Sequence, residues 1–134
     1  CMRQPHLPAI SRADVRVTDS ELASSLRFDA DDPFPAVYAT SRMIALMELA
    51  ASRVLRPHLE NDELSVGVAV DILHTAATPT GALVTATARY TGQEGKLYVF
   101  EVIATDDAGE IGRGTHKRAV VSTSRLTAGA AKRV

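Results

Sequence analysis

The sequence TSRMIALMELAASRVL, residues 40–55, carries apolar side chains every three or four residues, which is the spacing of one helical face. These side chains are Met43, Ile44, Met47, Ala50, Ala51, Val54 and Leu55. Thr40 is the expected N-cap, because its hydroxyl can accept a backbone hydrogen bond, and Pro57 is the expected stop. Leu46 and Leu49 widen the apolar surface beyond one stripe. We therefore predict a long central helix that protein encloses on most sides.

The segments on both sides of this helix have the character of β-strands. Before it, residues 13–17 suggest a short strand, and the polar residues 19–26 a helical stretch capped by Asp19 or Ser20. After it, four segments are rich in Val, Ile, Thr and Tyr: residues 63–74, 82–91, 96–106 and 110–123. Short connections favour antiparallel hairpins, so we expect these four strands to form a meander. The predicted class is α+β, with an antiparallel sheet that curls around one long helix.

Composition and charge limit the domain organisation and the partners. The 134 residues, 46% of them apolar, suit one domain (1–134), whose ends at 1–10 and 125–134 we expect to be flexible. The formal net charge of −1 argues against a nucleic-acid partner, and no apolar run is long enough for a membrane helix. The one cysteine, Cys1, excludes a disulfide framework and a thiolate zinc site. We expect a cytoplasmic protein with no metal or other cofactor and no membrane partner.

Glu48 is a carboxylate inside MIALMELAA, residues 43–51, where every other side chain is apolar. An ionised carboxylate at such a position needs a water-filled cleft or hydrogen-bond donors, and otherwise it holds a proton. The plainer interpretation is a glutamate at the helix edge that reaches solvent or a subunit contact. The sequence leaves both open.

His74 ends the apolar run LSVGVAVDILH, residues 64–74. Strand alternation predicts that, unless a bulge intervenes, it shares the inward face with Val66, Val68, Val70 and Ile72. His74 is then either a hydrogen-bonded core histidine or an acid-base group. If Glu48 faces the same interior, its carboxylate can orient the imidazole and set its tautomer.

Thr40 and Gly67 are two further candidates. Thr40 lies eight residues before Glu48, so the two side chains project within about 80° of each other around the helix axis. Gly67 interrupts a β-branched strand, which is typical of a bulge or of a close approach to the backbone.

Three stretches resemble the fluoroacetyl-CoA thioesterase type of hotdog-fold thioesterases. They are FPAVYATSRMIALMELA (34–50), HTAATPTG (74–81) and GEIGRGTHKRAVV (109–121), so the likeness runs from about Phe34 to Val121. The resemblance implies a hotdog fold, an antiparallel sheet wrapped around one helix. It also implies a homodimer with active sites at the subunit interface.

The resemblance further implies roles for single residues. Three positions match the family's catalytic residues: Thr40, Glu48 and His74. Three others match positions that contact substrate or cover the acyl pocket: Gly67, Arg118 and Phe34. The implied reaction is hydrolysis of an acyl-CoA thioester, with the Gly67 N–H polarising the carbonyl and His74 handling a proton. Glu48 either orients His74 or attacks the carbonyl, and both routes stay open.

Ser41 and Arg42 stand where the fluoroacetyl-specific type has glycine and an aromatic residue. We therefore expect a short ordinary acyl group on the substrate. Two alternatives are a noncatalytic hotdog dimer that binds acyl-CoA or another ligand, and a hotdog hydratase. The intact set of Thr40, Glu48 and His74 argues against the first, and the lack of a closely spaced aspartate and histidine pair argues against the second.

Overall fold

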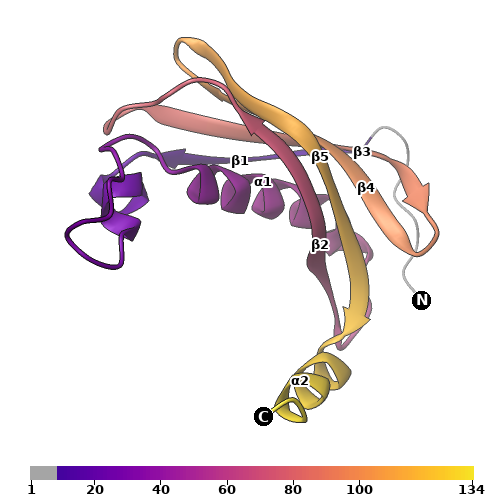
Figure 1. The fold of residues 1–134 in the computed structure, drawn as a ribbon. Coiled ribbons are helices and arrows are strands. Elements are labelled where there is room, and N and C mark those ends of the chain that lie inside the picture. The colour runs from indigo at the N-terminus through magenta and orange to yellow at the C-terminus, as the bar shows by residue number, and fades with distance from the viewer. Residues whose placement is uncertain (1–8) are drawn as a thin grey trace.

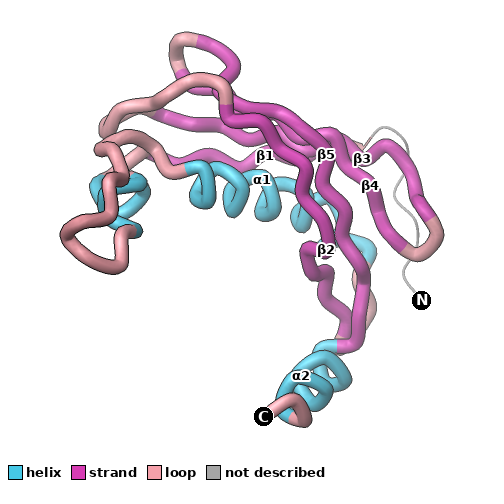
Figure 2. The backbone as a smooth tube through the Cα atoms, in the orientation of Figure 1, coloured by secondary structure: helices cyan, strands magenta, loops and turns pink. Residues whose placement is uncertain are grey.

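A curled antiparallel sheet holds one long helix on its concave side in the computed structural model, which describes residues 9–134 (Figures 1 and 2). The main elements in chain order are β1 (Ile10–Arg16), α1 (Thr40–Leu55), β2 (Glu63–His74), β3 (Leu83–Glu94), β4 (Leu97–Asp106), β5 (Gly109–Ser122) and α2 (Thr123–Ala131). This is the hotdog arrangement, so the predicted α+β class is confirmed.

Helix α1 lies where the side-chain spacing predicts it and packs mainly on β1 and β3. Its buried residues are Met43, Leu46, Met47, Ala50, Ala51, Val54 and Leu55. Ile44, expected on the buried face, is only half-buried, whereas Leu46 is buried. Leu49 is 41% exposed, so the prediction of a helix enclosed on most sides is wrong for the described chain.

The two ends of α1 differ in how well the sequence predicts them. Pro57 stops the helix as expected, in a short 3-10 turn over Arg56–His58. The N-cap, however, is Ala39, whose carbonyl accepts from the backbone of Arg42 and Met43 at 3.1 and 3.0 Å. Thr40 as the cap is therefore wrong, and its hydroxyl is available for another partner.

Strand order differs from the predicted meander in one place. The sheet runs β1-β3-β4-β5-β2, so β3, β4 and β5 do form a meander but β2 lies beside β5. The segment 75–82 crosses the end of the sheet instead of making a tight hairpin. Thr78, fully buried within it, donates to Asp106 at the end of β4 at 2.8 Å. As a result β2 is an edge strand.

A β-bulge in β2 changes which of its residues face inward. The pairing of β2 with β5 shifts between Gly67 and Ala69, which confirms the bulge predicted at Gly67. Beyond it, Val70, Ile72 and His74 lie on the inner face, in register with His116, Gly114 and Gly112. The inward orientation predicted for Val66 and Val68 is wrong, because alternation from Gly67 sends Val66 outward and Val68 lies in the bulge.

The segments outside the sheet bring three more differences. Residues 19–26 form two 3-10 turns, Asp19–Glu21 and Ala23–Leu26, and Thr18 caps the first in place of Asp19 or Ser20. The C-terminal stretch expected to be flexible contains α2, capped by Ser122. Cys1 and most of the N-terminal end expected to be flexible lie outside the described residues. In the described chain, no helix is long and apolar enough to cross a membrane.

Candidate active site

The hydroxyl of Thr40 and the imidazole of His74 form a hydrogen bond that joins the start of α1 to the end of β2. The distance from Thr40 Oγ1 to His74 Nδ1 is 2.7 Å. The pair can form because Ala39 caps the helix and the strand places His74 on the inner face. The hydrogen bond from Thr40 to His74 thus replaces the capping role that the sequence suggested.

Burial lowers the pKa of His74 below its usual 6.5, although the backbone of Ala76 acts in the opposite direction. The imidazole is therefore neutral at pH 7 and carries one lone pair that can accept a proton. Its Nε2 atom is buried and has no hydrogen-bond partner among the side chains and backbone of residues 9–134. A neutral imidazole with one unused nitrogen is suited to act as a general base.

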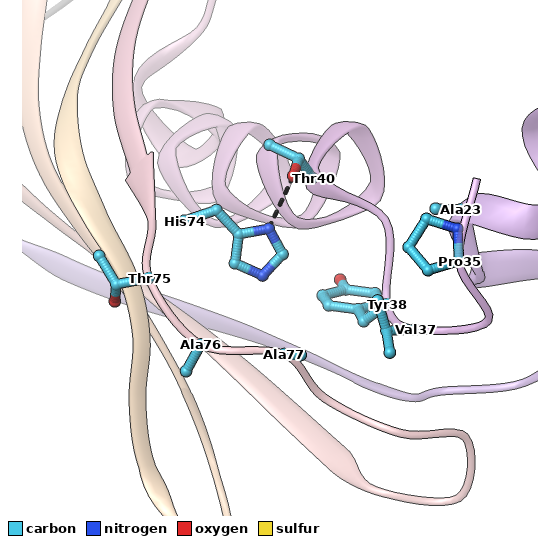
Figure 3. Close-up of a pocket in the computed structure, with 9 residues that line it drawn as sticks. All are labelled: Ala23, Pro35, Val37, Tyr38, Thr40, His74, Thr75, Ala76 and Ala77. Atoms are coloured by element: carbon cyan, nitrogen blue, oxygen red, sulfur yellow. Dashed lines mark hydrogen bonds between the residues drawn. The ribbon is translucent and has the colours of Figure 1, made fainter. Parts of the chain in front are cut away.

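A pocket of about 360 Å³ opens in front of this pair (Figure 3). Its wall combines the segment from Thr75 to Ala77 with Pro35, Val37 and Tyr38 from the chain before α1. Burial raises the pKa of Tyr38 to about 12, so this side chain keeps its proton at physiological pH. Tyr38 could not be predicted from the sequence as a pocket residue, because nothing in its spacing separates it from a core aromatic residue.

A second pocket, of about 620 Å³, lies beside the first and shares Ala23 and Thr40 with it. Phe34 and Phe28 are on its wall, and they are 46% and 101% exposed. Phe34 thus lines the same pocket as Thr40, next to the pocket that contains His74. Exposed aromatic side chains at the mouth of a pocket are a recurring feature of ligand sites.

Glu48 lies elsewhere, in a pocket of about 160 Å³ that it lines together with Gly67, the bulge of β2 and His116. Its side chain is 41% exposed, so in one chain the carboxylate lies in a pocket that is open to solvent. A Cβ atom at Gly67 would meet Glu48 Oε2 at 2.9 Å. The glycine therefore leaves room for the carboxylate to approach the β2 backbone closely.

Arg118 is buried behind this pocket and reaches Glu48 from β5. Its Nη1 lies 3.5 Å from Glu48 Oε2, while its side chain is only 7% exposed. Ser65 fixes the rest of the guanidinium, because Nε donates to Ser65 Oγ at 2.9 Å and Nη2 to the Ser65 carbonyl at 2.8 Å. Arg118 thus supplies the donor that a carboxylate on this helix needs.

The predicted site residues therefore form two groups in one chain. Thr40, His74 and Phe34 surround one pair of adjoining pockets, and Glu48, Gly67 and Arg118 form the other group. Glu48 and His74 line different pockets, so the predicted orientation of His74 by Glu48 within one chain is not what the fold brings about. Over residues 9–134, no group of three or more His, Cys, Asp or Glu side chains is arranged to hold a metal ion.

Ser65 and His116 belong to the second group but were missed by the sequence analysis. His116 lies two residues before Arg118 on the same strand, so alternation could have placed both on one face. Ser65 could not have been found this way, because its contact depends on the pairing of β2 with β5.

Comparison with known proteins agrees with this geometry. The sequence profile of the family described as fluoroacetyl-CoA-specific thioesterase matches residues 17–124. The fluoroacetyl-CoA thioesterase of Streptantibioticus cattleyicolor is 46% identical over 95 residues, which are 71% of this chain and 68% of that enzyme.

Solved structures extend the similarity to the whole chain. A structure of a fluoroacetyl-CoA thioesterase, 36% identical, superposes with a TM-score of 0.89 and covers 100% of this chain and 98% of its own. Other structures of that enzyme's variants hold fluoroacetate with CoA, or acetyl-CoA. A thioesterase superfamily member from Thermus thermophilus, 28% identical, has a TM-score of 0.87 over 98% of this chain and 94% of its own.

Proposed function

The chain belongs to the fluoroacetyl-CoA-specific thioesterase family and is a hotdog-fold thioester hydrolase, and we propose that it hydrolyses a short-chain acyl-CoA at Thr40, Glu48 and His74. The observation that carries this assignment is the 2.7 Å bond between Thr40 and a neutral His74 inside a pocket. A short acyl group fits the acetyl-CoA and fluoroacetate seen with the relatives' structures. Ser41 and Arg42 favour an ordinary acyl group over fluoroacetyl.

In the proposed reaction, the C–S bond of the thioester breaks and water supplies the new C–O bond. In both routes neutral His74 takes a proton from the water as it attacks, and Thr40 holds the ring in place. CoA leaves as a thiolate that picks up a proton. Glu48 either attacks the carbonyl first, giving an anhydride that water opens, or orients the attacking water.

We propose that the working unit is a homodimer, because β2 lies at an edge of the sheet and carries exposed apolar side chains. Val68, Val70 and Leu73 are 53%, 48% and 65% exposed along this strand. A long apolar edge invites pairing with another strand, and a second copy of β2 offers a self-complementary one.

Such pairing would unite the two groups of site residues. If two copies of β2 pair antiparallel with Gly67 opposite His74, and Val68 stays in the bulge, the two-fold axis passes at Asp71. His74 of one chain then lies opposite Gly67 of the other, beneath which Glu48 is held. Each site would combine Thr40 and His74 from one chain with Glu48 of the partner subunit.

The remaining proposed roles follow from the same arrangement. Phe34 would cover the acyl group from the second pocket, and the Gly67 backbone would approach the thioester carbonyl from the partner side. Arg118, predicted from the resemblance to contact substrate, is buried in one chain, which fits a role through the Glu48 carboxylate.

Purified protein incubated with acetyl-, propionyl-, butyryl- and fluoroacetyl-CoA, with free thiol measured over time, tests this function. We expect turnover of at least one of the unsubstituted short chains. His74→Ala should lower kcat by at least about a hundredfold, the scale for losing a positioned base. His58→Ala, on the 3-10 turn after α1, is the matched control and should leave kcat unchanged.

Other results would overturn the proposal. Binding of acyl-CoA without thiol release would favour the noncatalytic dimer, and hydration of an enoyl-CoA would favour the hydratase. Survival of activity within a few fold in His74→Ala would make His74 a core histidine. The cytoplasmic location stays a prediction, to be tested by fractionation of the source cells.

A further inference from the structure

His116 is a fully buried histidine at the centre of the second group, and the reaction as described does not use it. Only 1% of its surface is exposed. It lies on β5 between the β2 bulge and Arg118, and its Cε1 edge comes within 3.3 Å of a Cβ built at Gly67. On its remaining side the ring faces Phe100 of β4, with ring centroids 6.4 Å apart.

The partners of the two ring nitrogens determine the protonation state. Nδ1 lies 2.9 Å from the carbonyl oxygen of Ala69, which can only accept, so Nδ1 carries the hydrogen. Nε2 lies 3.1 Å from Nη1 of Arg118, which can only donate, so Nε2 holds a lone pair. Both bonds are made only by the neutral Nδ1–H form, because a second ring N–H would face the guanidinium donor.

The charges around the ring favour the same form. Burial lowers the pKa of His116, the Ala69 carbonyl opposes this, Arg118 lowers the pKa further and Glu48 raises it. The ring thus remains an acceptor for Arg118. Since the same Nη1 atom also reaches Glu48, the imidazole, the guanidinium and the carboxylate form one connected row.

We propose that His116 is a positioning residue for the thioesterase reaction. Its neutral imidazole takes one hydrogen bond from Arg118 and so aims the guanidinium at Glu48, which fixes the carboxylate under Gly67. His116 does not touch the reacting atoms and acts only through Arg118. The inference rests on the proposed role of Glu48 and adds a residue that the resemblance did not assign.

Two amide substitutions separate the proposed positioning role from a purely structural one, in which His116 only links β5 to β2 through the Ala69 carbonyl. The amide oxygen of His116→Gln reaches about as far as Nε2 and can still accept from Arg118. His116→Asn is shorter, so its amide can donate to Ala69 near the Nδ1 position but cannot reach Arg118. Misplacing a reacting group by about 1 Å costs on the order of a hundredfold in rate.

We expect His116→Gln to keep kcat within about threefold of wild type and His116→Asn to lose at least about tenfold, with KM little changed in both. In an Arg118→Met background the two variants should have equal kcat. His58→Gln and His58→Asn are the matched controls. Losses that are equal in both His116 variants, or larger for Gln than for Asn, would overturn the proposal.

A measurement on the wild-type protein covers the case in which the variants do not fold. ¹⁵N NMR of histidine-labelled protein at pH 7 should show a protonated Nδ1 and an unprotonated Nε2 for His116. The Nε2–H form or an imidazolium would overturn the inference. This readout does not depend on turnover, so a protein without thioesterase activity would contradict the proposed function and leave the tautomer result to be judged separately.

Discussion

Glutamine at position 48 removes a charge from the β2 pocket while keeping the size and hydrogen-bonding capacity of the side chain. If Glu48 acts in catalysis, as nucleophile or by orienting water, kcat should fall by at least about a hundredfold. If it is instead a structural partner of Arg118, the main loss should be in stability. The contacts in the structure allow the size of that loss to be worked out.

The ion pair with Arg118 is weak by its geometry. The two charged atoms are 3.5 Å apart, and the Glu48 side chain is 41% exposed, so water screens most of their attraction. Although Arg118 is buried, a pair whose carboxylate is this exposed contributes about 1 kcal/mol or less. Arg118 would keep Ser65 Oγ, the Ser65 carbonyl and His116 as acceptors, so it is not left unpaired. Glu48→Gln should therefore change the free energy of unfolding by no more than about 1 kcal/mol.

Thermal melts and thiol-release kinetics on this one variant decide between the two roles. A change of about 1 kcal/mol corresponds to a few degrees in Tm for a chain of this length. Breaking a buried pair would cost about 3 to 5 kcal/mol. The matched control is Glu101→Gln, which removes the more exposed carboxylate partner of Arg89 and should change neither quantity greatly. A large fall in Tm with full activity per folded molecule would refute the reasoning.

Three further predictions concern the glycine, the histidine and the sheet edge. Gly67→Ala should lower kcat about tenfold with a small change in Tm, because the methyl group mainly pushes the flexible Glu48 carboxylate and comes only to 3.3 Å from His116 Cε1; unchanged kcat would contradict this. Because burial lowers the pKa of His74 below 6.5, a pH-rate profile should show kcat/KM falling only below pH 6.5. The free energy of unfolding should also decrease as pH falls through 6.5, because His74 of the unfolded chain binds a proton at a higher pH than His74 of the folded chain. A kcat/KM that already falls above pH 6.5 would contradict the prediction for His74. Val70→Asp should give monomers in sedimentation at micromolar concentration and no turnover, and an intact dimer would show that β2 is not the interface.

Side-chain spacing predicts the helix and the strands of this fold well, but it does not predict which strands lie next to each other in the sheet. The limits of α1 and β2 follow from the local sequence. The spacing of apolar residues, the prolines and the turn residues each determine the backbone over only a few positions. The placement of β2 beside β5 does not, since it depends on how the segment 75–82 packs across the sheet. The bulge at Gly67 was predictable from a glycine in a β-branched strand, but its effect on Val66 was not.

The candidate site divides in the same way. Glu48 and His74 stand out in the sequence because each places a polar group where the pattern needs an apolar one. Their separation into two pockets is a property of the folded chain, and no spacing rule contains it. The contacts of Arg118 with Ser65 likewise arise only when β2 and β5 pair.

The central claim is that each site takes Thr40 and His74 from one chain and Glu48 from the other, and mixing two inactive variants tests it most directly. His74→Ala and Glu48→Gln homodimers, each inactive alone, are unfolded together and refolded at equal amounts. Every mixed dimer then has one site with both native side chains. Since half of the dimers are mixed and each has one such site of two, about a quarter of wild-type activity should return. Purified mixed dimers without activity would contradict the shared site.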